Sequence, residues 1–306
     1  MAFIFRNNIF VNKVDKNMNV LGEKNKNDIA YEIPEEPLVM LKIADCMEVL
    51  KDIPDSSIQL IVLDPPYNLK LAYWDVYDDY IAWAKEWLDE CYRVLKKSGS
   101  LVIFGGTQFQ GIKTGDLIEI IYYVRHYTKF NFVNSIVWYY KNGISASRFF
   151  ANRHEDIIWL TKTKKYYFDL DSVRVKYDSK TEALYLKDKR LNPENVKKGK
   201  NPTNVWEISR LNGNSHERVG HLTQKPLSII RRIVKSMSPP GEIVLDFFAG
   251  SGTTGRVCIE EKRNVILVDN DSKSRKYFSK HLENMQEGKY KFKYKETHNI
   301  SDFFNE

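Results

Sequence analysis

The chain has 306 residues, of which 42% are hydrophobic, so it can form one large domain or a domain with an insertion. Its 47 basic and 40 acidic side chains give a net charge of +7, which fits a nucleic-acid partner without requiring one. No apolar run approaches the ~20 residues of a membrane helix, and no signal-peptide pattern is present, so a membrane or secreted protein is not expected. The three cysteines (Cys46, Cys91 and Cys258) lack metal-ligand spacing, which predicts reduced thiols, no metal site and a cytoplasmic protein.

Strand and helix patterns alternate along most of the chain. Short apolar runs predict strands at 39–44, 58–63, 101–104, 132–139, 156–160, 242–245 and 264–268. Apolar residues at helical spacing predict helices at 80–97, 225–237, 253–261 and 272–285. This alternation predicts an α/β fold with a parallel sheet covered by helices. Residues 162–220 interrupt it with a Lys- and Asn-rich stretch, which predicts an inserted subdomain because structureless loops of that length are uncommon.

The segment Asp64-Pro65-Pro66-Tyr67 directly follows the predicted strand 58–63. Two consecutive prolines fix the backbone and remove two N–H donors, so neighbouring carbonyl oxygens need partners elsewhere. An acid, fixed carbonyls and an aromatic ring predict a pocket that accepts hydrogen bonds from a flat amine such as a nucleobase. The alternative is a strand-ending turn without a ligand. The loop 68–75 favours the pocket, because it places Tyr73 and Trp74 beside the acid.

A second candidate site is the glycine-rich segment 248–255, which joins a predicted strand to a predicted helix. Glycines allow a tight turn and close approach of a ligand, and the helix N-terminus offers free N–H groups. Asp269 ends the next strand, where a carboxylate can accept both hydroxyls of a ribose. Gly250, Gly252 and Gly255 also satisfy Gly-x-Gly-x-x-Gly, so a nicotinamide dehydrogenase is a competing interpretation. That interpretation leaves the Asp-Pro-Pro-Tyr segment unexplained.

With these motifs together, the chain resembles the S-adenosylmethionine-dependent DNA amino-methyltransferases in their β-class motif order. In that order the catalytic motif comes first, the target-recognition region next and the glycine motif last. The segment 221–226 (His-Leu-Thr-Gln-Lys-Pro) is similar to the family's His-Pro-Thr-Gln-Lys-Pro, with Leu222 in place of proline, and 152–155 (Asn-Arg-His-Glu) is similar to a further signature. We expect Leu222 to alter the local turn rather than the chemistry. The matches run from about residue 40 to 285.

The resemblance implies a Rossmann-like methyltransferase fold, with a mostly parallel seven-stranded sheet covered by helices and an inserted target-recognition region. It divides the chain into an N-terminal extension (1–35), a catalytic half (36–161), the target-recognition insertion (162–220), a cofactor-binding half (221–286) and a C-terminal tail (287–306).

The resemblance also implies roles for individual residues. Asp64 and the carbonyl of Pro65 would accept the two hydrogens of the target amine, and Tyr67 would stack on the base; the catalytic residues are thus Asp64, Pro65, Pro66 and Tyr67. S-adenosyl-L-methionine would be bound by Asp45, Cys46, Thr223, Lys225, Phe248, Ala249, Gly250, Ser251, Gly252, Thr253, Thr254 and Asp269. Asp45 has a second interpretation as a helix N-cap. DNA would be bound by Tyr73, Trp74, Arg148, Arg153, Arg210 and Arg218, with lysines such as Lys162 on phosphates.

The implied reaction is methylation of the N6 amine of a flipped adenine in double-stranded DNA, as half of a bacterial restriction–modification system. In the family, Asp at the first catalytic position favours adenine and Ser favours N4-cytosine, so N4-cytosine is the nearest alternative. An RNA or protein-glutamine methyltransferase and a catalytically inactive DNA-binding module are more distant alternatives. The resemblance leaves a cognate restriction endonuclease and a homodimer open as partners, and it places the protein at the nucleoid.

Overall fold

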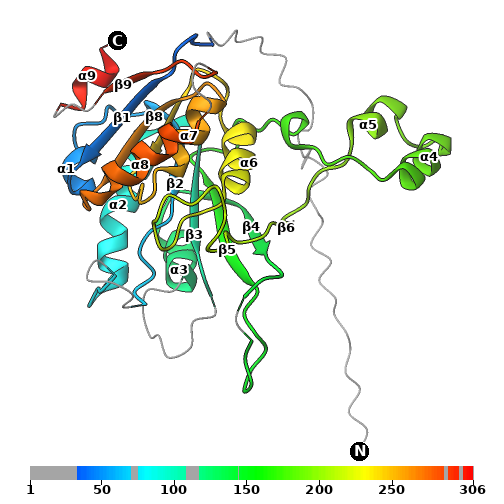
Figure 1. Cartoon of the computed structure of the whole chain (residues 1–306), viewed down its shortest axis with the longest axis horizontal. Helices are drawn as coiled ribbons and strands as arrows, with labels where there is room; N and C mark the ends of the chain where they lie inside the picture. Colours follow the sequence, from blue (N-terminus) through cyan, green and yellow to red (C-terminus); the bar gives the residue numbers. More distant parts are fainter. Residues whose placement is uncertain are drawn as a thin grey trace, which may run out of the picture. The chain divides into compact units, whose positions relative to one another are not determined.

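A nine-stranded β-sheet organises the part of the chain that the structure describes (Figure 1). The structure is a computed structural model, which describes residues 33–69, 75–107, 117–143, 145–285, 289–295 and 299–305, all within the contact unit Tyr31–Glu306. The strands are β1 (Leu38–Ile43), β2 (Ile58–Leu63), β3 (Leu95–Gly105), β4 (Asn131–Tyr139), β5 (His154–Thr161), β6 (Val205–Glu207), β7 (Ile243–Asp246), β8 (Asn264–Asp269) and β9 (Lys293–Lys295). The helices are α1 (Cys46–Leu50), α2 (Tyr80–Val94), α3 (Leu117–Tyr127), α4 (Ser179–Lys187), α5 (Pro193–Lys198), α6 (Leu227–Met237), α7 (Thr253–Glu260), α8 (Lys273–Glu283) and α9 (Ser301–Phe304), with a 3₁₀ turn at Asp171–Val173.

The strand order is β6-β4-β5-β3-β2-β7-β8-β1-β9. All neighbouring pairs are parallel except β3 with β5 and β4 with β5, so β5 is the antiparallel strand of a mostly parallel sheet. This arrangement confirms the predicted α/β, Rossmann-like fold. The sheet contains the seven predicted strands and, at its two edges, the additional strands β6 and β9. Each has three residues, too few for an apolar alternation to be visible in the sequence.

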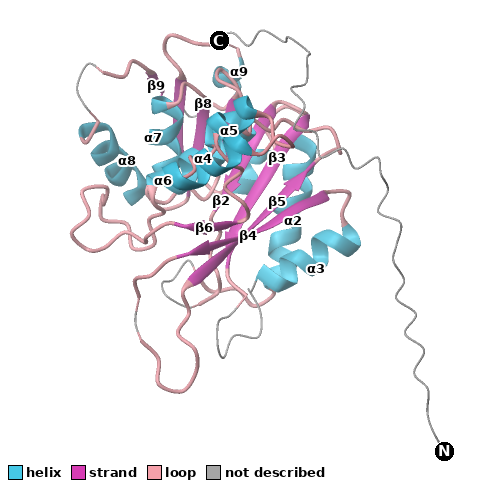
Figure 2. Cartoon of the chain, turned by 90° about the vertical axis from the view of Figure 1, so that its right-hand side faces the viewer, coloured by secondary structure: helices cyan, strands magenta, loops and turns pink. Residues whose placement is uncertain are grey.

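Two layers of helices cover the sheet, one on each face (Figure 2). Side chains of β2 alternate between them: Ile61 and Leu63 pack with α1, α2, α3 and α9, whereas Leu60 and Val62 pack with α6, α7 and α8. The period of two along a strand therefore supplies both cores from one run of apolar residues. No helix in the described segments is long and apolar enough to cross a membrane.

Several predicted helix boundaries differ from the structure, and two of the differences have a clear physical cause. The helix predicted at 80–97 ends at Val94, because Leu95 turns to an extended conformation and pairs with Ile58 as the first residue of β3. The two lysines that follow favour helix, but the long-range pairing outweighs this local preference. The helix predicted from 225 starts at Leu227, since Pro226 is extended with ψ of 139°. Helices α1 and α3 were not predicted: α1 has only five residues, and α3 carries apolar side chains on several faces.

The stretch 162–220 contributes both to the sheet and to a separate lobe. Trp206 of β6 is buried in the core, and Tyr166 packs against the same core. Helices α4 and α5 instead form a lobe that extends away from the sheet (Figure 1), and α4 buries none of its residues. Two backbone hydrogen bonds of 2.9 Å between Val175 and Lys200 close the neck of this lobe, which we define as residues 175–200.

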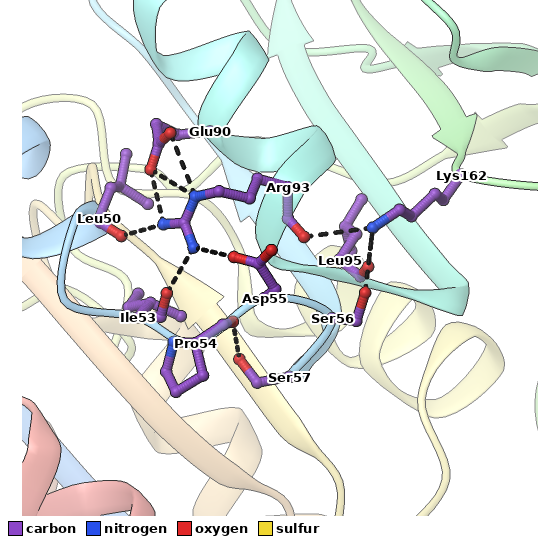
Figure 3. A network of polar contacts seen from close by, with 10 residues as sticks. All are labelled: Leu50, Ile53, Pro54, Asp55, Ser56, Ser57, Glu90, Arg93, Leu95 and Lys162. Carbon is purple, nitrogen blue, oxygen red and sulfur yellow. Dashed lines mark hydrogen bonds and ion pairs between the residues drawn. The ribbon is translucent and has the colours of Figure 1, made fainter.

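At the amino-terminal ends of β2 and β3, two basic side chains bind carbonyl oxygens (Figure 3). Arg93 donates to the carbonyls of Leu50 and Ile53 and pairs with Asp55 and Glu90. It thereby ties the end of α2 to the loop before β2. Because Arg93 is the common donor, the loop geometry depends on its planar guanidinium.

The ammonium group of Lys162 lies in the same region (Figure 3). It donates to the carbonyls of Arg93 and Leu95 at 3.2 and 2.8 Å and to the Ser56 hydroxyl at 3.2 Å. The sequence suggested Lys162 for phosphate binding, but its ammonium group instead makes these contacts within the fold.

Replacing Arg93 with Met is expected to lower the free energy of unfolding by about 1–3 kcal/mol, because the carbonyls of Leu50 and Ile53 lose their charged donor. Urea unfolding of the full chain measures this. The matched control is Arg190→Met, whose side chain is 88% exposed and pairs only locally with Asp188, so little change is expected. Equal effects of the two substitutions would contradict a structural role of the Arg93 contacts.

Candidate active site

A cavity of about 650 Å³ lies at the carboxyl ends of four strands. The segments after β1, β2, β7 and β8 all line it, as expected for an open α/β sheet, where ligands bind outside the carboxyl ends of strands. The cavity brings together most of the residues predicted for catalysis and cofactor binding: Asp45, Cys46, Asp64, Pro65, Pro66, Tyr67, Thr223, Lys225, Phe248, Ala249, Gly250, Ser251, Thr253, Thr254 and Asp269.

The Asp-Pro-Pro-Tyr segment leaves β2 with its polar groups held in place. The Tyr67 hydroxyl donates to Asp64 Oδ1 at 2.7 Å, and the Tyr80 hydroxyl donates to the Pro66 carbonyl at 2.8 Å. Tyr80 is buried at the start of α2, so the segment is tied to the helix that packs beneath it. Since the Pro66 carbonyl is already bonded, the Pro65 carbonyl is the backbone acceptor to consider beside Asp64.

A buried lysine contacts the acid of this segment. Lys225 Nζ lies 2.7 Å from Asp64 Oδ2 and 3.3 Å from Glu155 Oε2, and the side chain is almost fully buried. Burial lowers the pKa of Lys225, but the two carboxylates outweigh this effect and hold the pKa above its usual value. The ammonium also lies 5.5 Å from the centre of the Tyr67 ring. The structure thus places Lys225 beside Asp64, and its predicted contact with the cofactor's carboxylate stays a prediction.

The glycine segment turns sharply between β7 and α7. Gly250 has φ of +49° and Gly252 has φ of +79°, a region that favours glycine. The Gly250 N–H donates to Asp269 Oδ2 at 2.6 Å, which links this turn to the end of β8. Gly252 does not line the cavity: a Cβ there would lie 2.6 Å from the Phe278 ring, so this glycine allows α8 to pack closely against the turn.

Two further acids end strands at the cavity wall. Asp269 Oδ1 accepts from the N–H of Asp271 at 2.8 Å, and burial raises the pKa of Asp269. Each oxygen of this carboxylate has capacity for another donor, as a ribose would require. Asp45 caps α1 by accepting from the Met47 N–H at 2.8 Å, so its N-cap interpretation is confirmed. Its position in the cavity wall is compatible with a second role.

The cavity also contains two residues that the sequence reasoning did not select. Asp246, the last residue of β7, accepts from the Thr254 hydroxyl at 2.6 Å and the Phe248 N–H at 3.2 Å. Its burial raises the pKa of its carboxyl to about 7. His221 packs its ring against Gly250 and edge-on to Tyr277, and burial lowers its pKa. The sequence does contain a signal for Asp246, because it is an acid that directly follows a predicted strand shortly before the glycine-rich segment.

The residues predicted for DNA binding are distributed over several positions. Arg210 and Arg218 line the cavity; Arg210 stacks over the Tyr140 ring at 5.0 Å, and Arg218 donates to the His221 carbonyl at 3.0 Å. Arg148 is exposed on the connection between β4 and β5, and Arg153 packs on Gly143 of that connection. Tyr73 and Trp74 lie outside the described residues.

Comparison with known proteins gives consistent results over most of the chain. The family model N6_N4_Mtase, described as DNA methylase, matches residues 58–298. The type II methyltransferase M.HpaI of Haemophilus parainfluenzae is 37% identical over 233 residues, which cover 74% of this chain and 68% of that protein. The DNA adenine methyltransferase YhdJ of Escherichia coli is 34% identical over 239 residues, covering 74% and 77%. The solved M1.HpyAVI–SAM complex has a TM-score of 0.55 at 22% identity, covering 81% and 98%.

The raised pKa of Asp246 predicts a pH-dependent stability difference. Its carboxyl titrates near 7 in the folded chain and near 3.8 when unfolded, so the folded state binds the proton more tightly. Protonated Asp246 therefore contributes fully to the free energy of unfolding below about pH 4, and this contribution is lost as the pH rises through 7. The variant Asp246→Asn does not titrate, so its stability relative to the unsubstituted protein should increase between pH 4 and 8. Urea unfolding across this range measures the difference, and a constant difference would contradict the assignment.

Proposed function

Since this chain belongs to the DNA methylase family of N6- and N4-amino-methyltransferases, we propose that it methylates the N6 amine of an adenine flipped out of duplex DNA. The observation that carries the proposal is the single cavity in which Asp64 and Pro65 lie with the glycine turn and Asp269. An amine acceptor and a candidate nucleoside-binding edge share one cavity. The adenine-specific relative YhdJ supports the choice of base.

The cavity wall from β7, β8 and β1 fits S-adenosylmethionine. Asp269 offers acceptors for ribose hydroxyls, Asp45 an acceptor for an exocyclic amine, and the turn at Gly250 a stretch of backbone that lines the cavity. S-adenosylmethionine would supply a methyl group bound to a sulfonium, whose neutral thioether is a good leaving group. The M1.HpyAVI–SAM complex, a relative in fold, is consistent with this cofactor.

On the opposite wall, Asp64 and the Pro65 carbonyl act on the target amine. The lone pair of an adenine N6 is delocalised into the ring, which makes the amine a poor nucleophile. Asp64 and the Pro65 carbonyl accept hydrogen bonds from its two N–H groups, which pulls the nitrogen towards tetrahedral geometry and frees the lone pair. Once the nitrogen carries the methyl group it loses one proton, for which Asp64 is the acceptor at hand. The site therefore works by alignment and hydrogen-bond acceptance more than by strong basicity.

Lys225 has to share Asp64 with the incoming amine. In the structure its ammonium lies between two carboxylates, at 2.7 Å from Asp64 and 3.3 Å from Glu155. Glu155 keeps this buried positive charge paired when Asp64 turns an oxygen towards the amine, because an unpaired buried charge is costly. Lys225 and Glu155 are positioning residues in this proposal.

An N4-cytosine amine is the second candidate, because it presents the same exocyclic geometry and the family includes both reactions. Expression in a methylation-free host followed by genome-wide mapping of modified bases separates the two, and it also reports the recognition sequence. The type II relative M.HpaI supports a cognate restriction endonuclease. Such an endonuclease, a homodimer and action at the nucleoid belong to the same proposal.

The lobe 175–200 is proposed as part of the DNA-reading region. Its residues include eight basic and four acidic side chains, so the lobe carries a positive charge that suits phosphates. Arg210 and Arg218 line the cavity, which supports their proposed contact with bases beside the target, where a guanidinium can be bidentate to guanine.

Replacing Asp64 with Ala should abolish methylation while S-adenosylmethionine still binds, because the acceptor of the amine is lost and the cofactor wall is intact. Asp64→Asn should retain more activity than Asp64→Ala, since an amide oxygen still accepts a hydrogen bond. Methyl incorporation into DNA and calorimetric cofactor binding measure the two properties. The control is the exposed Asp89→Ala on α2, which should leave both unchanged. Near-normal turnover of Asp64→Ala would disprove the catalytic assignment.

Replacing residues 177–198 with two glycines should remove α4 and α5 while keeping the Val175–Lys200 bridge that closes the neck. Cofactor binding should persist, whereas affinity for the specific site should fall and its salt dependence should weaken as phosphate contacts are lost. Fluorescence anisotropy with specific and unrelated duplexes at several salt concentrations measures this. The replacement leaves Tyr166 and Trp206, which pack in the core, unchanged. If the variant keeps its preference for the specific duplex, recognition of the DNA sequence belongs to other segments.

A further inference from the structure

The connection between β4 and β5, residues 140–153, forms an extended hairpin (Figures 1 and 2). Apart from residue 144, it lies within the described part of the chain. One side of the hairpin forms part of the cavity wall, through Tyr140, Gly143, Ser145, Ala146, Phe149, Ala151 and Asn152. The hairpin therefore contributes to the wall of the cavity that a flipped base would enter.

The base of the hairpin is held in place by polar contacts. The Tyr140 N–H donates to the Arg153 carbonyl at 2.8 Å, which continues the β4–β5 ladder. Asn142 donates to the Arg210 carbonyl at 3.1 Å and to Asn212 at 2.8 Å, and Lys141 pairs with Glu207 at 2.5 Å. The hairpin is thus fixed to the segment after β6, and its outer part is presented in a defined direction.

Two adjacent phenylalanines lie on this outer part. Phe149 is 48% exposed and lines the cavity, whereas Phe150 is 98% exposed. Isolated exposed apolar residues are common on protein surfaces. Here, however, Phe150 directly follows the cavity-lining Phe149 in the sequence and stands two residues after the exposed Arg148. The sequence 140–153 contains three basic residues and no acidic residue, so nothing on the hairpin repels a phosphate backbone.

We propose that Phe150 is a wedge that enters the duplex at the step from which the target base leaves. A flipped base leaves an unstacked gap, and a flat apolar side chain can refill it by stacking on the neighbouring bases. Phe149, which is half-exposed and lines the cavity, then lies on the path of the departing base. The exposed Arg148, two residues before Phe150 in the sequence, is available to a phosphate of the same duplex. The occupant of this surface is duplex DNA, and the inference rests on the proposed base-flipping methylation.

The test compares Phe150→Ala and Phe150→Trp on duplexes that contain the mapped recognition site. One duplex is fully paired, and the other carries a mismatch opposite the target base, which lowers the cost of flipping. Phe150→Ala should reduce kcat/KM on the paired duplex about tenfold or more, and most of this loss should disappear on the mismatched duplex. Phe150→Trp should retain activity on both. The control Tyr122→Ala removes another exposed aromatic, 56% exposed and outside the cavity lining on α3, and should change neither.

A second measurement follows base flipping directly. With 2-aminopurine at the target position, binding of the unsubstituted protein should raise fluorescence, and Phe150→Ala should raise it less at equal DNA occupancy. Equal activity losses on both duplexes, or no loss, would overturn the wedge. A change in sedimentation without DNA would also overturn it, by assigning Phe150 to contact between copies of the chain. Absence of DNA methylation by the unsubstituted protein would instead overturn the proposed function.

Discussion

The contact of one buried ammonium with two carboxylates organises the candidate site. Lys225 precedes α6, Asp64 follows β2, and Glu155 lies at the start of β5, so their meeting joins three distant parts of the chain. Burial of a charge is costly unless it is paired and hydrogen-bonded, and the pair of acids meets this requirement. The positions of the segment after β2, the start of β5 and the entry to α6 are consequently interdependent.

The same constraint connects stability with chemistry. The proposed amine acceptor, Asp64, is also a partner that keeps Lys225 charged, and Tyr67 bonds to that acid at 2.7 Å. The opposite wall is linked in a comparable manner, because Asp269 accepts from Gly250 and Asp246 accepts from Thr254. In each of these two parts of the cavity, carboxylates at strand ends accept hydrogen bonds from neighbouring residues. These bonds hold the cavity in shape before a ligand enters.

Much of this arrangement was predictable because it depends on strand ends. Asp45, Asp64 and Asp269 each follow a short, nearly continuous apolar run, and parallel strands bring their carboxyl ends to one edge of the sheet. The contact between Lys225 and Asp64 was not predictable, because it depends on how two segments about 160 residues apart approach each other. The exposed position of Phe150 was also hidden, since an apolar residue beside a strand is ordinarily expected in the core. Long-range strand pairing also determines the edge strands β6 and β9 and the end of α2, so these features could not be predicted from local sequence.

The neck of the lobe has a consequence for how such proteins can diverge. Only Val175 and Lys200 bridge its two sides by backbone hydrogen bonds, and α4 contributes no side chain to the buried core. Substitutions, insertions or deletions beyond the neck therefore change few of the contacts that stabilise the sheet, and a longer loop costs little in closure entropy. Mutations can accumulate in this segment largely independently of selection on the cavity. A lineage with this architecture can explore new surface chemistry in the lobe while the residues around Asp64 and Asp269 stay unchanged.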